Sequence, residues 1–418
     1  MTTVSENLRN LDELRRAYAR LIVRLGLNLQ AGHRLIIFDA PVEAVDFVAL
    51  IAQEAYGAGA RLVDPLWTSD SLIQARFSCS PRDSFGEYPG WRIDALLQAA
   101  ETGDAVLLIP STNPDLMKDQ DPTLVAQLLA GESRSMRPFS AWVRANRLTW
   151  SVASIPTPAW AAKVFPTPSP AAGLERLWRE LMTFCGADKE DPVVSWGERM
   201  ELIGRRKGRL TAKRYVSLHL RGPGTDLTVG LPPRHLWHGG EVSTPQGIVF
   251  SPNIPTEEVF TLPDRLQVDG VVTATRPLHH DGLCIEGLTL TFTAGRVSAV
   301  TAQRGAEALG RLIAADEGAA RLGEVAIVAS SSAIAQSGLT FFNPLIDENA
   351  ACHLALGYAY RFCLQDGPSL TDDEFLSAGG NESSLHLDFM VGSGELKVAG
   401  VTRTGKEEEI LRDGEWTL

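Results

Sequence analysis

The chain of 418 residues lacks an excess of positive charge, since 39 lysines and arginines stand against 51 aspartates and glutamates. The formal net charge of -12 repels phosphate backbones and acidic membranes, so neither nucleic acid nor a membrane is expected as a partner. The N-terminal segment "MTTVSENLRNLDELRRAYARL" also lacks a long uninterrupted apolar run. We therefore expect neither a signal peptide nor a membrane span.

Cysteine is scarce: the five cysteines are scattered and never spaced as C-x-x-C. This usage is typical of proteins from a reducing compartment, so we expect a cytoplasmic protein. Cys352 lies beside His353, but adjacent residues on a helix diverge by about 100° and do not face each other. We interpret Cys352 as a packed thiol and not as a nucleophile.

Several common catalytic motifs are missing. No H-E-x-x-H, G-x-S-x-G or G-x-x-x-x-G-K-[ST] motif occurs. Their absence argues against the commonest zinc proteases, serine hydrolases and phosphate-loop proteins. The segment Gly222–Leu227, "GPGTDL", lacks the third glycine of a dinucleotide loop and joins two expected strands, so it predicts a tight turn. The histidine pair of "RPLHHDG", residues 276–282, is interpreted as part of a surface turn.

The composition, with 44% hydrophobic and 22% charged residues, is that of a globular protein large enough for two or three domains. Strand and helix patterns alternate in the first part of the chain, which predicts an α/β domain with a parallel sheet between about residues 30 and 155. The expected elements are a helix over Leu8–Leu27, a strand over Arg34–Ala40, a helix over 42–59, a strand over 60–67, a helix over 91–103 and a strand over 104–110. The proline-rich segment 151–173 is expected to form irregular surface, and helix is expected from Ala172 to about Leu210.

After Lys213 the pattern changes to short β segments punctuated by glycine, which suggests a mixed or antiparallel, barrel-like sheet. Helical inserts are expected over 306–316 and 347–364. The sequence thus predicts an α/β N-terminal domain over residues 1–210 and an α+β C-terminal domain over residues 211–418.

The most informative polar residues lie between positions 348 and 388. On a helix, His353 and Tyr360 would project from one face, because residues seven apart return to nearly the same azimuth. On a strand, His386 and Asp388 would point together. With Glu348 they form a set that suits hard divalent metals. A His-x-Asp pair alone is often only a satisfied polar pair, but two of just 8 histidines fall in this window.

Two further acidic positions are candidates. Glu257 and Glu258 follow a proline on an extended segment, so only one of them can aim at a shared site. Glu324 begins a strand that looks buried, where a carboxylate must be paired, exposed or bound to a metal. Each could also be a solvated acid at the end of a strand.

Taken together, these segments resemble the thermophilic-type metallo-aminopeptidases, the family of aminopeptidase T and aminopeptidase S. The blocks that carry the resemblance span nearly the whole chain: "GLNLQAGHRL", "APVEAVDF", "KVFP", "GPGTDLTVGL", "NIPTEEVFTLP", "LGEVAIV", "FFNPLIDENAACHLALGYAY" and "GGNESSLHLDFMVGS". The resemblance implies hydrolysis of N-terminal residues from peptides with a free N-terminus, through water activated by two divalent metal ions. It also implies a homodimer.

Carried over position by position, the resemblance implies six metal ligands and one catalytic residue, Tyr360. The ligands would be Glu258, Glu324, Glu348, His353, His386 and Asp388. The ions could be zinc, cobalt, manganese or magnesium. Glu324 is the expected bridging carboxylate, and Tyr360 is expected to donate a hydrogen bond to the oxyanion of the tetrahedral intermediate.

Two other functions remain open at this point. Some relatives of this family are non-haem Fe(II) ring-cleaving dioxygenases, whose single metal needs two histidines and one carboxylate. The three additional acids argue against that chemistry. A non-catalytic metal-binding or peptide-binding protein is the second alternative, and the complete ligand set argues against it.

Overall fold

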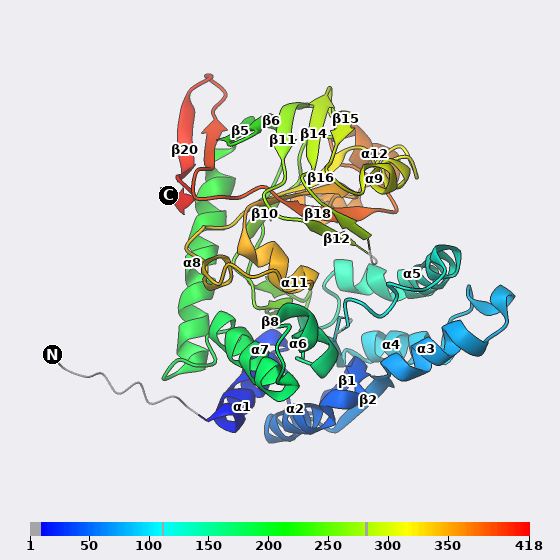
Figure 1. Cartoon of the computed structure of the whole chain (residues 1–418). Helices are drawn as coiled ribbons and strands as arrows, with labels where there is room; N and C mark the ends of the chain where they lie inside the picture. The colour runs from blue at the N-terminus through cyan, green and yellow to red at the C-terminus, as the bar shows by residue number, and fades with distance from the viewer. Residues whose placement is uncertain (1–9, 111–112, 281–282) are drawn as a thin grey trace. The chain divides into compact units, whose positions relative to one another are not determined.

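The computed structural model describes residues 10–110, 113–280 and 283–418, apart from the side chains of residues 279, 280 and 283 (Figure 1). The chain divides into two compact units. Unit 1 is Met1–Glu198 with Glu241–Pro255, and unit 2 is Arg199–Gly240 with Thr256–Leu418. The units therefore divide at Arg199, near the boundary expected at residue 210, and a later segment returns to unit 1.

Unit 1 contains a five-stranded sheet in which every pair of neighbours is parallel. Its strands, in spatial order, are β2 (Leu62–Thr68), β1 (Arg34–Pro41), β3 (Ala105–Leu108), β4 (Trp150–Ala153) and β9 (Asn253–Ile254). The strand segments are rich in buried apolar residues, as expected for a parallel sheet covered by helices. The expected α/β portion with a parallel sheet is confirmed.

The helices of unit 1 follow the expected alternation, with three additions, α3, α5 and α6. The helices are α1 (Leu11–Leu21), continued by the π-helix η1 (Ile22–Gly26), α2 (Val45–Gly57), α3 (Asp70–Cys79), α4 (Gly90–Thr102), α5 (Pro122–Arg144), α6 (Pro158–Val164) and α7 (Pro170–Phe184). Helix α8 (Pro192–Lys213) begins in unit 1 and ends in unit 2. Among the described residues, no helix combines the length and the apolarity needed to cross a membrane.

The expectation of irregular surface over residues 151–173 is wrong. This segment contains most of β4 and the helix α6, and Trp160 is only 1% exposed. The reason lies in the first turn of α6, where the Thr157 side chain accepts a hydrogen bond from the backbone N–H of Trp160 and Pro158 occupies the first helical position. Proline is compatible with that position, since its missing N–H is not needed there.

Unit 2 contains an eight-stranded antiparallel sheet. Its strands, in spatial order, are β15 (Arg296–Thr301), β14 (Thr289–Thr293), β11 (Val268–Thr273), β6 (Thr225–Gly230), β5 (Ser217–Gly222), β19 (Lys397–Val401), β20 (Glu407–Arg412) and β21 (Glu415–Trp416). The expected antiparallel sheet is confirmed, whereas its barrel-like curvature stays a prediction. The tight turn expected in "GPGTDL" is also confirmed, because Gly224 takes a φ of 70° between β5 and β6.

A second sheet of unit 2 has four antiparallel strands in the order β10, β16, β17, β18. Their bounds are Val259–Thr261, Leu322–Ile327, His353–Gly357 and His386–Met390. The short helices of unit 2 are α9 (Ala306–Leu312), α10 (Ala333–Gln336), α11 (Pro344–Asp347) and α12 (Asp372–Ser377). Figure 1 shows β10, β16 and β18 of this sheet beneath strands β11, β14 and β15 of the large sheet.

The expected helix over 347–364 is wrong, because His353–Gly357 forms strand β17 inside the four-stranded sheet. All five residues of β17 are buried, so the strand shows no alternation of polar and apolar side chains. A short apolar run of this kind cannot be assigned to helix or strand from periodicity alone. The helical insert expected over 306–316 is confirmed by α9.

Candidate metal centre

The four-stranded sheet of unit 2 positions five of the six expected ligands. Glu258 directly precedes β10, Glu324 lies on β16, and His353 is the first residue of β17. His386 and Asp388 lie on β18, two residues apart, so they share a face of the strand. The acids and imidazoles, which are far apart in sequence, thus meet because neighbouring strands pair.

The register of the strands explains the spacing within the cluster. Glu324 pairs with Ala355, and Ala355 pairs with Asp388 on the other side. The two carboxylates therefore flank a residue with only a methyl side chain, on the face that also carries His353. Ala355 leaves room between Glu324 and Asp388 that a larger side chain would fill.

Glu324 lies between the two histidines. Its Oε1 atom is 3.6 Å from Nε2 of His353, and its Oε2 atom is 3.5 Å from Nε2 of His386. On one side, Nε2 of His353 also lies 3.2 Å from Oε2 of Glu258. On the other side, Nε2 of His386 lies 3.7 Å from Oδ1 of Asp388. The arrangement has two halves that share one carboxylate.

Both imidazoles are oriented by backbone carbonyls. Nδ1 of His353 lies 3.1 Å from the carbonyl oxygen of Ala351, and Nδ1 of His386 lies 3.0 Å from that of Tyr358. Carbonyl oxygens only accept hydrogen bonds, so each Nδ1 carries the hydrogen and donates. The Nε2 atoms are therefore directed at the carboxylates, as in metal-binding histidines whose second nitrogen is hydrogen-bonded.

The protonation of the cluster is strongly perturbed. Burial raises the pKa of Glu258, and burial together with the charges of Glu258 and Asp388 raises that of Glu348 well above its usual range. Burial also opposes ionisation of Glu324, but hydrogen bonds and charges of His353 and His386 together hold its pKa at about 2. Burial opposes protonation of His386, yet Asp388 and Glu324 raise its pKa to about 10. The acidic groups thus require nearby positive charge.

The donor atoms fit divalent metal ions. Glu258, Glu324 and His353 are buried and offer one ligand atom each within 4.8 Å of one another. Oε2 of Glu258 has no partner of hydrogen-bonding geometry among the described residues. A buried carboxylate oxygen without a donor is unfavourable, and a cation would stabilise it. Oxygen and imidazole nitrogen are also the ligands that zinc and manganese accept.

The neighbouring acid Glu257 points elsewhere, as expected for adjacent residues on an extended segment. Its Oε1 atom lies 3.3 Å from Nη1 of Arg199. Its backbone N–H donates to Oδ1 of Asn349 at 2.6 Å. Asn349 directly follows Glu348, so one short segment both carries an expected ligand and fixes the backbone next to Glu258.

Glu348 follows α11 as the first residue of a 3-10 turn, Glu348–Ala350. The preceding Asp347 accepts hydrogen bonds from the backbone N–H groups of Phe341 and Asn343, at 2.8 and 3.0 Å. The non-glycine residue Phe342 between them takes a left-handed φ of 55°. Asp347 thus holds a strained turn in place directly before Glu348.

Tyr360 lies beside the cluster, although not for the reason that helical spacing suggested. Its ring centroid is 5.5 Å from that of His386, and the charges of Tyr358, Glu324 and Asp388 together with burial raise the pKa of its hydroxyl well above the usual range. Tyr358 is not among the residues expected at the site, yet its ring centroid lies 4.5 Å from that of His386. Strand β17 ends at Gly357, and Tyr358 follows it. In an extended chain, residues two apart lie on one side, so an extended reading of this segment would have placed Tyr358 together with Tyr360.

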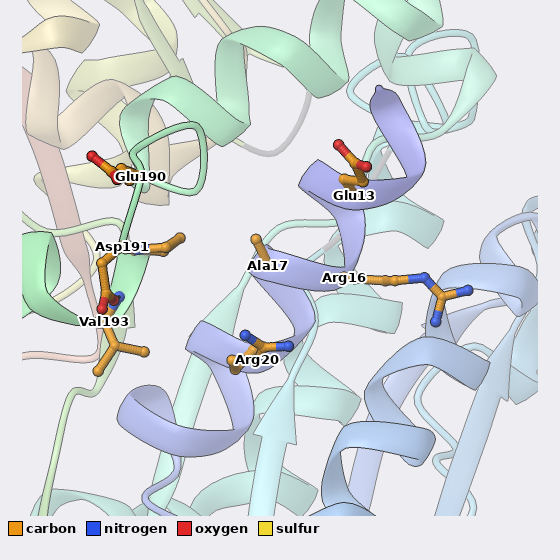
Figure 2. Close-up of a pocket in the computed structure, with 8 residues that line it drawn as sticks. Glu13, Arg16, Ala17, Arg20, Glu190, Asp191 and Val193 are labelled. Atoms are coloured by element: carbon orange, nitrogen blue, oxygen red, sulfur yellow. The ribbon is translucent and has the colours of Figure 1, made fainter. Parts of the chain in front are cut away.

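The remaining sequence candidates are resolved as follows. Cys352 is packed as expected: its Sγ lies 3.2 Å from the carbonyl oxygen of Val328, and burial raises its pKa to about 11. The side chains of the histidine pair at 279 and 280 lie outside the described residues. A cavity of about 450 Å³ lies in unit 1. Figure 2 draws residues that line it, mainly charged side chains of α1 and of the segment that leads to α8. None of the expected site residues lines it.

One solved structure shares only the fold. The structure of a 2,5-dihydroxypyridine dioxygenase from Pseudomonas putida KT2440 superposes with a TM-score of 0.51 over 98% of both chains, at 12% sequence identity. At this identity the likeness shows a common fold and carries no statement about the reaction.

Other similarities are much closer. Aminopeptidase 2 of Geobacillus stearothermophilus is 42% identical over 96% of this chain and 97% of its own length. The solved structure of wild-type AmpT from Thermus thermophilus has a TM-score of 0.92 at 37% identity, over 97% of this chain and 99% of that one. The family model described as thermophilic metalloprotease (M29) matches residues 11–416. The resemblance stated from the sequence is confirmed, and the chain belongs to the thermophilic metalloprotease family M29.

Proposed function

We propose that unit 2 removes single residues from the N-terminus of peptides with the help of two divalent metal ions. Family membership makes the chain a metal-dependent peptide hydrolase. The observation that carries the proposal of two ions is the position of Glu324, whose two oxygens each lie within 3.6 Å of a different imidazole nitrogen. A single ion would leave one half of this arrangement without a cation.

The residues that would hold the ions fall on the two sides of Glu324. Glu258 and His353 lie on one side, and His386 and Asp388 lie on the other. Glu348 is the sixth proposed ligand. Burial and the neighbouring acids raise the pKa of its carboxyl, which supports a position close to the other ligands. Bound divalent ions polarise the scissile carbonyl and make a nucleophile from water at neutral pH.

The chain's own residues supply the rest of the chemistry. The free α-amino group of a substrate needs an acidic or metal partner in the site, and this requirement would restrict cleavage to N-termini. Tyr360 keeps its hydroxyl proton, because the pKa of that group is raised by Tyr358, by burial and by the nearby acids. It can therefore donate a hydrogen bond to the oxyanion of the tetrahedral intermediate, a contribution that is worth about 10²- to 10³-fold in kcat in other hydrolases.

The finer features of the family resemblance belong to the same proposal. We propose two domains, residues 1–210 and 211–418, with the catalytic residues in the second. We propose further that the protein is a cytoplasmic homodimer, a state that size-exclusion chromatography with light scattering would test. A mass of one 45.3 kDa chain in that measurement would contradict the dimer.

Metal analysis combined with turnover tests the central proposal. The purified protein is treated with a chelator, and zinc, cobalt, manganese or magnesium is added back while hydrolysis of leucine p-nitroanilide is followed. We expect loss of turnover on chelation, recovery on re-addition, and two bound ions per chain at full activity. One oxygen-sensitive Fe(II) per chain, with ring cleavage and no peptide hydrolysis, would instead support the dioxygenase alternative.

A further inference from the structure

A continuous row of rings leads away from the metal centre. The ring of His386 lies 5.5 Å from that of Tyr360, which stacks on Phe362 at 5.0 Å. Phe362 in turn lies 4.8 Å from the ring of His238. Phe260 touches the same group, 5.9 Å from Tyr360 and 6.2 Å from Phe362. We call Tyr360, Phe362, Phe260 and His238 the aromatic row; all four are half-buried.

The aromatic row lies on the ligand face of the four-stranded sheet. Phe260 follows Glu258 by two residues on an extended segment, so both side chains point to the same side. Phe260 pairs with Ala326, which pairs with His353 on the next strand. The aromatic row therefore borders the metal centre on the side of β10, the edge strand.

Buried core residues lie directly behind the aromatic row. Phe260, Tyr360 and Phe362 pack against a cluster whose members are each at most 4% exposed. These members are Leu262, Ala359, Cys363, Leu364 and Phe375. Packed core residues therefore close the aromatic row on one side. A ligand side chain that ends at the row would fit this arrangement better than a peptide chain that runs on past it.

The aromatic row carries no formal charge near neutral pH. Burial, followed by the charge of Lys207, lowers the pKa of His238 to about 4, so its ring is neutral. Nε2 of His238 has no hydrogen-bond partner among the described residues. The carboxylates of Glu324 and Asp388 lie beside His386, the ring at which the aromatic row meets the metal centre. The site thus presents acids for an amine and, next to them, uncharged rings.

We propose that the aromatic row receives the side chain of the first residue of the substrate and gives the enzyme a preference for apolar N-terminal residues. The proposal rests on the proposed aminopeptidase function. In an aminopeptidase the residue before the cleaved bond is the end of the chain, so its side chain can occupy a closed site beside the metal centre. Uncharged rings favour leucine and phenylalanine over glutamate, lysine and arginine, whose charges would lose hydration there.

Truncation of Phe362 tests the preference. We expect Phe362→Ala to lower the ratio of kcat/KM for leucine p-nitroanilide to that for alanine p-nitroanilide about tenfold or more, because apolar pockets discriminate by about 10- to 200-fold per group. Phe362→Leu keeps an apolar side chain and should lose less. Leu266→Ala is the matched control, since Leu266 is 53% exposed in the same unit and lies outside the row; it should leave the ratio unchanged.

A charge exchange gives an independent readout. His238→Glu places a carboxylate at the far end of the aromatic row. It should raise the kcat/KM for arginine p-nitroanilide relative to that for leucine p-nitroanilide at least several-fold. His238→Gln is the uncharged comparison. Unchanged ratios in Phe362→Ala and His238→Glu, at full metal content, would overturn the proposal but leave the aminopeptidase function intact. A wild-type protein that binds metal and cleaves none of the anilides would overturn both.

Discussion

At the scale of single residues, Glu324 occupies the central position of the cluster. It is the one carboxylate whose two oxygens lie near different histidines, and hydrogen bonds from those histidines keep it ionised despite its burial. Other members of the cluster contact one half of it. The charge of Glu324 should therefore matter more than its shape.

The substitution Glu324→Gln separates charge from shape. We expect loss of bound metal and a fall in turnover of at least about 100-fold, since the amide removes a charge and turns an N–H₂ group toward one imidazole. Metal content by elemental analysis and hydrolysis of leucine p-nitroanilide measure the two effects. Glu307→Gln is the matched control, because the Glu307 side chain is 96% exposed. Full turnover in Glu324→Gln would refute the central role.

At the scale of elements, strand β17 separates the two halves of the cluster with a small side chain. Ala355 stands between Glu324 and Asp388 in the strand register, and Gly357 stands opposite His386. Gly357 has a φ of 107°, and a Cβ there would meet the carbonyl oxygen of Leu385. The strand thus combines buried packing with space for the ions beside it.

We expect Ala355→Leu to weaken metal binding without unfolding the chain. The larger side chain would occupy the space between the two carboxylates, and overpacking in a buried strand typically costs about 1 to 3 kcal/mol. Isothermal titration with zinc and a urea unfolding curve would report the two quantities. Ala355→Gly, which adds no volume, should retain metal affinity; equal affinity in the leucine variant would show that Ala355 does not border the ions.

How far the sequence predicts these elements depends on local signals. Several helices and strands of unit 1, among them α2, α4, β1 and β3, were predictable, because their apolar patterns are clear and some end at glycines such as Gly103, which is left-handed in the structure. Helix α5 was not assigned, although Asp121 and Pro122 form a regular helix start. Strand β17 was taken for helix because it is buried on both faces.

The expected residues of the candidate site come mainly from the family resemblance, and their roles stay a prediction. The spacing of His386 and Asp388 on a strand was a sound physical signal, and the opposite directions of Glu257 and Glu258 were too. The helical argument that linked His353 to Tyr360 was wrong, because His353 lies on strand β17. Pairing across β16, β17 and β18 cannot be read from local periodicity, because the partners are far apart in sequence.

A pH-dependent ion pair in the large sheet spans strand β19. Arg221 on β5 donates two hydrogen bonds to Glu407 on β20, at 2.9 and 3.1 Å, and His219 contacts the same carboxylate. Hydrogen bonds from Arg221 and His219 lower the pKa of Glu407 to about 2. The pair is largely exposed, so its contribution to stability should be below about 1 kcal/mol.

The sign of the pH effect follows from that lowered pKa. In the unfolded chain Glu407 should titrate near about 4.3, so its stabilising contribution is present above that pH and is lost as the pH falls toward about 2. We therefore expect the difference in unfolding free energy between the wild type and Glu407→Gln to be largest near neutral pH and to shrink below about pH 5. A difference that grows on acidification would contradict this assignment.

At the scale of the whole molecule, the ligands connect segments that are more than a hundred residues apart. Glu258 directly precedes strand β10 and Asp388 lies on β18 of the same sheet, with Glu324 and His353 on the strands between them. A cation bound only by the folded chain stabilises it by mass action. Without a cation the buried acids oppose one another, as the raised pKa values of Glu258 and Glu348 indicate.

Removal of metal should therefore lower the unfolding temperature. At free metal about 100-fold above the dissociation constant, binding at one site contributes about 2.7 kcal/mol. We expect chelation to lower the Tm in differential scanning calorimetry, re-addition to restore it, and Glu324→Gln to show little response to either. An unchanged Tm on complete metal removal would mean that the cluster is stable without ions.

The position of Cys352 determines how the proposed centre responds to oxidants. Its sulfur is directed at the Val328 carbonyl and stays a protonated thiol, so Cys352 is not a metal ligand. All of the proposed ligand atoms are oxygen or nitrogen. Peroxide and alkylating reagents attack accessible thiolates. Cys79 is exposed, whereas Cys352 is buried. Oxidative damage that disables thiolate-ligated zinc sites would thus leave this set of ligands chemically intact.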